Sequence, residues 1–294
     1  MIKAAGFVCG AQAEQPAYNS SPITKGALFT AMKPGEGQPP EKLTEEEKEL
    51  VENNGCAVVE NKPGLSPEIM RNMYKRVFAY LVFLPVVLFG ASGRMDWVNA
   101  WVYVAFIIVL MLAYTASLAR NSPDLIMERM QSPWKKDIKP WDKALAPLVA
   151  VVMPVSIMLV SAVEMRYHWP PQVTPWLSGA AFCAYLAGFL FSHWAMLENR
   201  YFSAVVRIQT DRGHKVVDTG PYAYIRHPGY TGAMVYLLAL PLALGSYWGL
   251  IPAVTTCVLL IIRTSLEDST LVKELDGYRE YTSKVRYRLI PGVW

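Results

Sequence analysis

The stretch that decides the fold runs from Asp218 to Gly245 and reads DTGPYAYIRHPGYTGAMVYLLALPLALG. From Gly229 onward the chain carries no Asp, Glu, Lys or Arg until Arg263. That run is well above the roughly 20 residues that a helix needs to cross a bilayer core of about 30 Å. Because Gly245-Ser-Tyr-Trp-Gly249 interrupts the run, we expect two helices joined by a tight hairpin. The polar cluster before it is either a membrane anchor or part of a site.

Uncharged runs of similar length recur upstream in a chain that is 53% hydrophobic and only 18% charged. This composition is typical of a membrane protein rather than a soluble domain. Together with the two helices of the opening stretch, these runs predict an all-α integral membrane bundle of about six transmembrane helices. The upstream runs are Val77 to Ala91, Trp97 to Ala119, Ala144 to Val163 and Thr174 to Leu197.

The loops between these runs alternate in charge. The segments 120–143 and 198–228 are rich in Lys and Arg, whereas 92–96 and 164–173 hold a single Arg each. Lys and Arg are retained on the cytoplasmic side of a membrane. We therefore expect a multi-pass membrane protein with both termini, and any site built from the basic loops, on the cytosolic side.

Residues 1–65 differ from the rest of the chain, being rich in Gly, Pro, Ser, Asn and Glu. Such a composition cannot bury enough apolar surface to offset chain entropy, so we expect a polar, disordered tail before a membrane domain over 66–294.

The four cysteines are scattered and form no CxxC, which indicates neither a disulfide framework nor a metal site. The net charge of +4 favours contact with membrane lipids over nucleic acid.

Two neighbouring motifs before the hairpin could carry chemistry. In Arg226-His-Pro-Gly-Tyr230, a proline at the first turn of a helix leaves backbone N–H groups free, which favours an anionic ligand group. Arg and Tyr at that position are also common interfacial anchors. The preceding HKVVDTGPY, His214 to Tyr222, is either an extended piece of a site or a turn that only redirects the chain.

The end of the last apolar helix carries the third candidate. Arg263 and Glu267 are spaced i, i+4, which puts them on one helix face, with Asp268 beside them. They form either a surface ion pair or part of a polar cavity. His193, inside the fourth run, is a candidate by default but could merely cap toward Glu198. The sequence has no GxGxxG after a strand, no Walker lysine loop, no HExxH and no GxSxG.

The ordered combination of GPYAYIRHPGY, RTSLED and GYREYTSKVRYRLIPGVW resembles the isoprenylcysteine carboxyl methyltransferase family. It also resembles the wider group of membrane methyltransferases that includes the phospholipid N-methyltransferases. The resemblance covers roughly Glu198 to Trp294 and implies that 198–294 is the cofactor-binding part. It implies a methyltransferase that uses S-adenosyl-L-methionine on a lipid-like acceptor, first of all the carboxylate of a prenylcysteine-type substrate.

The resemblance also implies which residues would form the site. Glu267 would hold the polar end of the cofactor, and Arg263 would lie toward the methyl acceptor, so these two are the expected catalytic residues. The family's paired glutamates appear here as Glu267-Asp268, which leaves the role of the shorter carboxylate open. The other residues expected to contact the cofactor are Gln209, His214, Lys215, Val216, Val217, Tyr222, His227, Pro228, Gly229 and Tyr230.

Two other functions stay open on these motifs. Some membrane sterol and steroid reductases are similar around an Arg-His-Pro-x-Tyr element but bind NADPH. A non-enzymatic membrane protein could also keep the same scaffold. The C-terminal YRLIPGVW and the Arg-x-x-x-Glu spacing favour the methyltransferase over the reductase, and the intact Arg263, Glu267 and His227 speak against a non-enzymatic protein.

Overall fold

The computed structural model describes residues 7–9, 56–58, 67–131 and 137–294, and the chain divides into two compact units, Met1–Gly64 and Leu65–Trp294. In the first unit, β1 (Phe7–Cys9) pairs antiparallel with β2 (Cys56–Val58), and Val8 lies opposite Ala57. The expectation that 1–65 is a disordered tail falls almost entirely outside the described residues.

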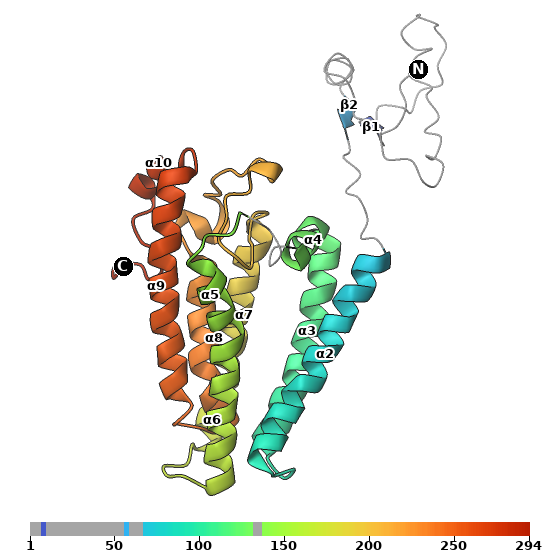
Figure 1. Cartoon of the computed structure of the whole chain (residues 1–294), viewed down its shortest axis with the longest axis vertical. Helices are drawn as coiled ribbons and strands as arrows, with labels where there is room; N and C mark the ends of the chain where they lie inside the picture. The colour runs from blue at the N-terminus through green and yellow to red at the C-terminus, as the bar shows by residue number, and fades with distance from the viewer. Residues whose placement is uncertain (1–6, 10–55, 59–66, 132–136) are drawn as a thin grey trace, which may run out of the picture. The chain divides into compact units, whose positions relative to one another are not determined.

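The second unit is helical throughout its described residues, which confirms the all-α prediction (Figure 1). Its elements in chain order are α2 (Pro67–Ser92), α3 (Val98–Asn121), α4 (Pro123–Gln131), α5 (Asp142–Pro147), the π-helix Leu148–Val152, α6 (Met153–Tyr167), α7 (Pro175–Glu198), the 3₁₀ turns Thr210–Arg212 and Gly220–Ala223, α8 (Pro228–Leu244), α9 (Leu250–Glu274) and α10 (Tyr278–Lys284).

Five helical stretches among the described residues are long and apolar enough to cross a membrane, and they make this an integral membrane protein. The stretches are Pro67–Ser92, Val98–Asn121, Asp142–Tyr167, Pro175–Glu198 and Leu250–Glu274. The remaining expected span, α8, has only 17 residues. At 1.5 Å per residue it is about 26 Å long, shorter than a bilayer core of about 30 Å. The predicted bundle of about six transmembrane helices thus consists, among the described residues, of five helices long enough to span a membrane and the shorter apolar helix α8.

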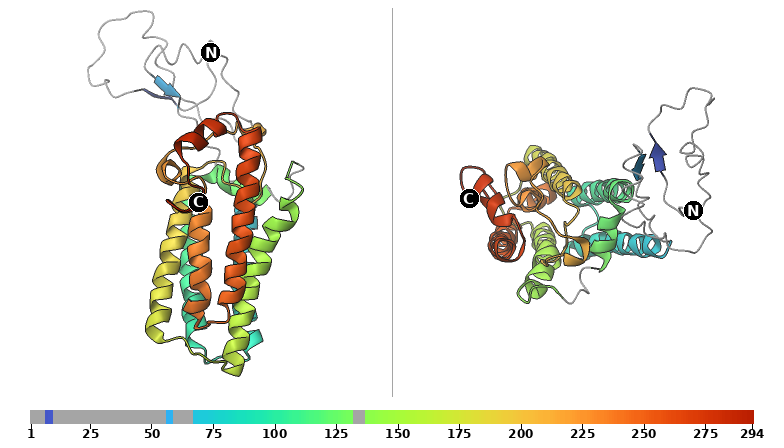
Figure 2. Two further views of the ribbon diagram at one scale, coloured as in Figure 1. Left: turned by 90° about the vertical axis from the view of Figure 1, so that its left-hand side faces the viewer. Right: turned by 90° about the horizontal axis from the view of Figure 1, so that it is seen from above.

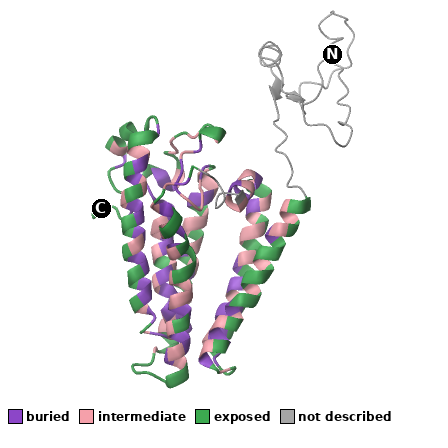
Figure 3. Cartoon of the chain, viewed as in Figure 1, coloured by how far each residue is buried: buried purple, intermediate pink, exposed green. Residues whose placement is uncertain are grey.

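Large apolar side chains cover the outer surfaces of these helices. Exposed examples are Val86 on α2, Val109 on α3 and Val254 on α9, and exposed residues follow the helices along much of their length in Figure 3. A contiguous apolar surface of this kind would aggregate in water, so it fits a lipid environment. A cluster of buried apolar side chains instead lies between α2, α3 and α6 to α9, and two smaller clusters lie beside α4 and α10.

The ends of α8 follow from local sequence. His227 takes a non-helical conformation at the N-cap, and Pro228, whose φ suits a helix and whose missing N–H is not needed, opens the first turn. At the other end Gly245 has a φ of 85°, a left-handed conformation that costs glycine little. The chain therefore reverses at the predicted hairpin and continues into α9.

A buried carboxylate holds that hairpin. Glu164 on α6 accepts hydrogen bonds from the Ser246 hydroxyl and from the backbone N–H groups of Tyr247 and Trp248, the latter at 3.0 Å. An ionisable group inside a membrane bundle is a functional candidate by default. Here the hairpin donors account for the Glu164 oxygens, which makes its role structural.

α7 and α8 pack at unusually close range, and they lie side by side in both views of Figure 2. A Cβ placed on Gly232 would lie 2.5 Å from the carbonyl oxygen of Gly188, and one on Gly188 would lie 2.8 Å from that of Gly232. Small residues at such crossings let membrane helices approach each other closely. This contact fixes the start of α8 beside the end of α7.

We predict that Gly232→Ala destabilises the protein by about 1–3 kcal/mol, because the added methyl group must push the two helices apart. The matched control is Gly179→Ala on α7, where a Cβ meets nothing within 4 Å. Thermal unfolding in detergent measures both. A Gly232→Ala midpoint equal to that of Gly179→Ala would contradict the close contact.

Candidate functional site

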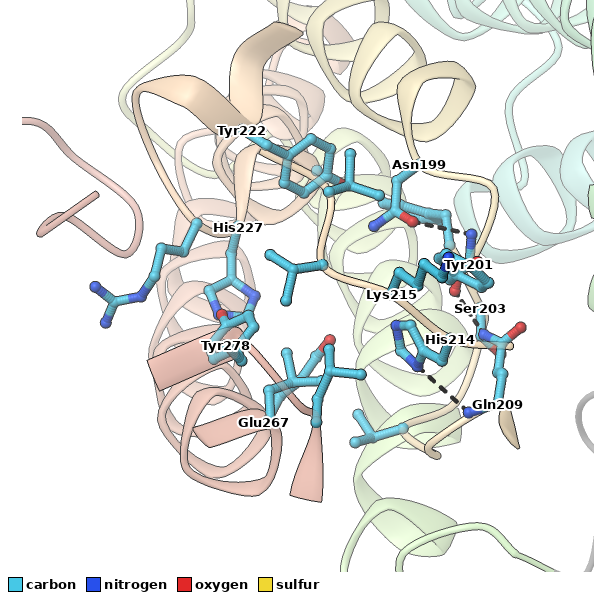
Figure 4. A pocket seen from close by; sticks show the side chains of 18 of the residues that line it. Asn199, Tyr201, Ser203, Gln209, His214, Lys215, Tyr222, His227, Glu267 and Tyr278 are labelled. Atoms are coloured by element: carbon cyan, nitrogen blue, oxygen red, sulfur yellow. Dashed lines mark hydrogen bonds between the residues drawn. The ribbon is translucent and has the colours of Figure 1, made fainter. Parts of the chain in front are cut away.

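A pocket lies at the end of the helical unit where α7 ends, α8 begins and α9 ends. Its walls come from the loop after α7, the first turn of α8, the last turns of α9, and α10 (Figure 4). The residues that line it are Asn199, Tyr201, Phe202, Ser203, Val205, Val206, Arg207, Gln209, His214, Lys215, Val216, Val217, Tyr222, Arg226, His227, Gly229, Tyr230, Glu267, Leu271, Leu275, Tyr278 and Tyr281.

The pocket is narrow inside and continues into open solvent. Its enclosed volume is about 100 Å³, below the roughly 300–1,000 Å³ of typical small-molecule sites. A nucleoside-sized ligand would therefore have to extend to the mouth or displace side chains there.

The Arg226-His227 segment is held by the C-terminal part of the chain. The Arg226 N–H donates to the Tyr287 carbonyl at 3.0 Å, and the His227 N–H donates to the Arg288 carbonyl at 2.9 Å. The Arg226 guanidinium also donates to the Val285 carbonyl at 2.8 Å. The C-terminal segment thus fixes the wall of the pocket to which the His227 ring belongs.

Asp268, whose role the sequence leaves open, is the centre of this wall. It is 2% exposed, and both of its oxygens accept hydrogen bonds from the Arg226 guanidinium at 2.8 Å. The Tyr278 hydroxyl donates to it at 3.0 Å and Arg288 Nε at 2.9 Å, while His227 Nε2 lies at 3.3 Å. A carboxylate buried this deeply is stable only with such partners. Asp268 therefore organises the wall.

Glu267, one residue earlier on α9, faces the pocket and is half-buried. Its Oε2 accepts a hydrogen bond from the Tyr230 hydroxyl at 2.5 Å. The His227 and Tyr230 rings are parallel, with centroids 5.8 Å apart. The first turn of α8 and the end of α9 thus present an anionic group beside two stacked rings.

Arg263 is not in an ion pair with Glu267, and it does not line the pocket. Its Nε and Nη2 donate to the two oxygens of Asp142 at 2.8 and 3.0 Å, and Nη2 donates to the Ala204 carbonyl at 3.1 Å. The interpretation of Arg263 and Glu267 as a surface ion pair is wrong, because Asp142, at the start of α5, is fully buried and needs a cation.

The face of the Arg263 guanidinium is still directed at the site. Its central carbon lies 5.3 Å from the centroid of the Tyr230 ring, within the range of a cation–π contact. Asp142 in turn accepts the N–H of Val206, at 2.6 Å, from the loop after α7. Arg263 therefore links α5, that loop and Tyr230 behind the pocket.

The loop after α7 is fastened by a second buried arginine. Arg207 donates to both oxygens of Glu128 on α4, at 3.0 and 2.9 Å, and also to Asp137 and Asp211. Burial lowers the pKa of Arg207, but its hydrogen bonds to the carboxylates raise the pKa by more. The pKa of Arg207 therefore lies above its usual value, and the guanidinium is charged. The loop is thereby a fixed wall, although it has little regular structure.

The side-chain amide of Gln209 forms hydrogen bonds within the same loop. Its Nε2 donates to the Tyr201 carbonyl at 2.6 Å, and its Oε1 accepts from Arg212 at 2.6 Å. Gln209 is 1% exposed, so little of it is left for a ligand. The expected cofactor contact by Gln209 stays a prediction, and the geometry gives its side chain a role in shaping the loop.

His214 has a defined tautomer. Its Nδ1 accepts the backbone N–H of Gln209 at 3.3 Å, which places the proton of the neutral ring on Nε2. The ring packs on Tyr201, with centroids 4.5 Å apart. Burial, aided by the charges of Arg207 and Arg212, lowers the pKa of His214 to about 4. At neutral pH His214 is thus an uncharged hydrogen-bond donor in the pocket wall.

The structure brings most of the predicted cofactor residues to this one pocket. Every one of them lines it except Pro228, which is buried at the start of α8. Arg263 lies behind the Tyr230 ring instead of in the wall. That these residues bind a cofactor stays a prediction. Sequence reasoning did not single out Asn199, Tyr201, Phe202 and Tyr278, which also line the pocket, because single aromatic and amide residues in a loop or a helix carry no motif.

His193 lies apart from the pocket. Its Nε2 is 2.9 Å from the Ser117 hydroxyl on α3, and its Nδ1 is buried with no hydrogen-bond partner among the described residues. The suggested cap toward Glu198 is not seen, since the ring packs against Tyr114 and Phe189.

The walls of the pocket coincide with a segment that can be compared with known proteins. Residues 180–273 match the model of the isoprenylcysteine carboxyl methyltransferase family. The match confirms the resemblance seen in the motifs, over the part of the chain that runs from α7 to the end of α9. It includes Glu267 and the whole loop after α7.

Two known proteins are similar to this chain. The protein-S-isoprenylcysteine O-methyltransferase of Schizosaccharomyces pombe is 30% identical over 92 residues, which are 29% of this chain and 36% of that protein. The chain thus matches about a third of the length of this relative. The solved structure of a eukaryotic intramembrane Ras methyltransferase, an isoprenylcysteine carboxyl methyltransferase, is 18% identical and covers 73% of this chain and 75% of its own, with a TM-score of 0.44.

We predict that Asp268→Asn destabilises the protein by about 3–5 kcal/mol, because it leaves the buried Arg226 charge without its anion. Thermal unfolding in detergent measures the loss. The matched control is Asp276→Asn, at an exposed position soon after the end of α9, which should change stability by less than about 0.5 kcal/mol. Equal midpoints for the two variants would show that Asp268 does not organise the wall.

We predict that His214 stays neutral down to a pH near its folded pKa of about 4. In the unfolded chain its pKa is about 6.5, so the unfolded state binds the extra proton first. The contribution of neutral His214 to stability is complete above about pH 6.5 and is lost as the pH falls toward about 4. An NMR titration of histidine-labelled protein, assigned with His214→Gln, measures this pKa. A His214 signal that titrates near pH 6.5 would contradict the buried environment.

Proposed function

We propose that this protein is a membrane methyltransferase that uses S-adenosyl-L-methionine. The observation that carries the proposal is the overlap between the family match and the pocket. The match, residues 180–273, contains the pocket residues from Asn199 to Leu271. The same segment that resembles the family therefore builds the cavity in which a ligand could bind.

The chemistry of the pocket fits such a cofactor. The half-buried carboxylate of Glu267 suits the positively charged amino acid end, and the Nε2–H of His214 can donate to an acceptor group of the ligand. Tyr201 and Tyr222 offer rings to a base. Since the enclosed space is about 100 Å³, the cofactor would extend through the mouth of the pocket.

When bound, S-adenosyl-L-methionine supplies a methyl group on a sulfonium. An acceptor oxygen held beside it would form the new bond to carbon as the carbon–sulfur bond broke, with its electron pair left on sulfur. Such an in-line displacement depends mainly on positioning and dehydration, which the fixed walls around Glu267 and Tyr230 would supply.

The acceptor that we propose is the carboxylate of a prenylcysteine-type lipid. A carboxylate attacks as it stands and needs no general base, whereas an amine must first lose a proton. Glu267 Oε2 accepts a hydrogen bond from the Tyr230 hydroxyl at 2.5 Å, which engages one of the two carboxylate oxygens. The pocket thus suits an acceptor that needs no deprotonation better than an amine that must first lose a proton. Apolar helix surfaces beside it suit the lipid tail.

We also propose that the pocket faces the cytosol. The loops around it, 120–143 and 198–228, are those rich in Lys and Arg, and such loops are retained on the cytoplasmic side.

Binding of S-adenosyl-L-methionine and of NADPH to the purified full chain, measured by calorimetry in detergent, tests the proposal. We expect saturable binding of S-adenosyl-L-methionine only. Glu267→Gln should weaken it by about tenfold or more, because a charge-assisted interaction is lost. Glu280→Gln, at an exposed position on α10, is the matched control and should bind as the wild type does.

Saturable binding of NADPH without binding of S-adenosyl-L-methionine would overturn the methyltransferase in favour of a reductase. No binding of either would favour a non-enzymatic membrane protein. If Glu267→Gln binds S-adenosyl-L-methionine as the wild type does, the cofactor assignment stands but Glu267 does not contact the cofactor.

A further inference from the structure

The arginines that are buried or half-buried differ in whether a carboxylate neutralises them. Among the described residues, every arginine that is buried or half-buried has a carboxylate partner except Arg129 on α4. The paired arginines are Arg94, Arg207, Arg212, Arg226, Arg263 and Arg288.

The Arg129 guanidinium lies against the pocket from outside. Its central carbon is 5.8 Å from the centroid of the Phe202 ring. Phe202 lines the pocket, and its ring also packs on Gly229, where a Cβ would lie 2.5 Å from it. The Phe202 ring therefore contacts both Arg129 and the first turn of α8.

Arg129 lies on α4, which packs on an apolar cluster. α4 contributes Leu125 and Ile126 to an apolar cluster against which Phe202 and Tyr114 also pack. A half-buried charge in such a place is a functional candidate by default, since the protein gains nothing from it without an anion.

A second polar atom without a partner borders the same cluster. The ring of His193 contacts Tyr114, and its Nδ1 is buried with no hydrogen-bond partner among the described residues. Ser192, the preceding residue, donates to the Gly229 carbonyl at 3.1 Å, although His193 itself does not line the pocket. A cation and a free ring nitrogen thus lie beside one apolar region.

We infer that Arg129 binds the carboxylate of the methyl acceptor, with the acceptor's apolar tail against the cluster of α3, α4 and α7. The inference rests on the proposed function and deepens it by naming the cation. It replaces Arg263 in that role, because two oxygens of Asp142 and the Ala204 carbonyl already occupy the Arg263 donors. Among the described residues the Arg129 guanidinium has no hydrogen-bond acceptor or carboxylate partner, and its central carbon lies over the Phe202 ring.

Binding of an N-acetyl-S-farnesylcysteine carboxylate and of its uncharged methyl ester tests this without the methylation reaction. The full chain is placed in lipid nanodiscs with no cofactor, and displacement of the tritiated carboxylate is measured. We expect Arg129→Gln to weaken carboxylate binding about 10- to 100-fold, the effect of a charged hydrogen bond, and to leave ester binding within about twofold. Arg129→Lys should retain part of the preference for the carboxylate.

The matched control is Arg120→Gln, an exposed arginine in the last turn of α3, which should keep the wild-type preference. If Arg129 only supports Phe202, Arg129→Gln weakens both ligands equally, and the inference is wrong. It is also wrong if the wild type does not prefer the carboxylate, or if oleate competes as well as the prenylcysteine. Failure of the proposed function can be distinguished from failure of this inference, because in that case the wild type does not bind S-adenosyl-L-methionine.

Discussion

The buried carboxylate of Asp268 is the interaction on which the site depends. It sits near the end of α9 and neutralises Arg226, from the turn before α8, and Arg288, from the C-terminal segment. Three parts of the chain that are far apart in sequence therefore share one anion. Because each partner would be costly to bury alone, the arrangement forms as a unit. The positions of His227 and Glu267 follow from it.

The loop after α7 is built on the same principle. Asp142 joins Arg263 to the backbone of the loop, and Glu128 joins α4 to Arg207. These contacts replace the hydrogen bonds that regular structure would provide, so an irregular segment can form a fixed wall. Against this background of neutralised arginines, the unpaired Arg129 differs in kind. Arg129 is half-buried without a carboxylate partner among the described residues, and this is the charge that we propose binds a ligand.

The membrane helices and the pocket are linked through α7 and α8. The close contact of Gly188 and Gly232 sets the distance between these helices, and Ser192 ties the end of α7 to Gly229. The apolar bundle thereby determines how wide the pocket is at the first turn of α8. A lipid tail can lie among the helices while its head group reaches a polar site at their end.

The sequence by itself determined the helices, the hairpin at Gly245 and the residues of the Arg226 to Tyr230 turn, because these depend on local apolar runs, prolines and glycines. It did not determine which charges meet. The i, i+4 spacing pointed to Arg263 and Glu267, yet tertiary structure paired Arg263 with Asp142 and Glu267 with Tyr230. Ion pairs between distant segments are decided by which groups are buried together, and burial is a property of the folded chain alone.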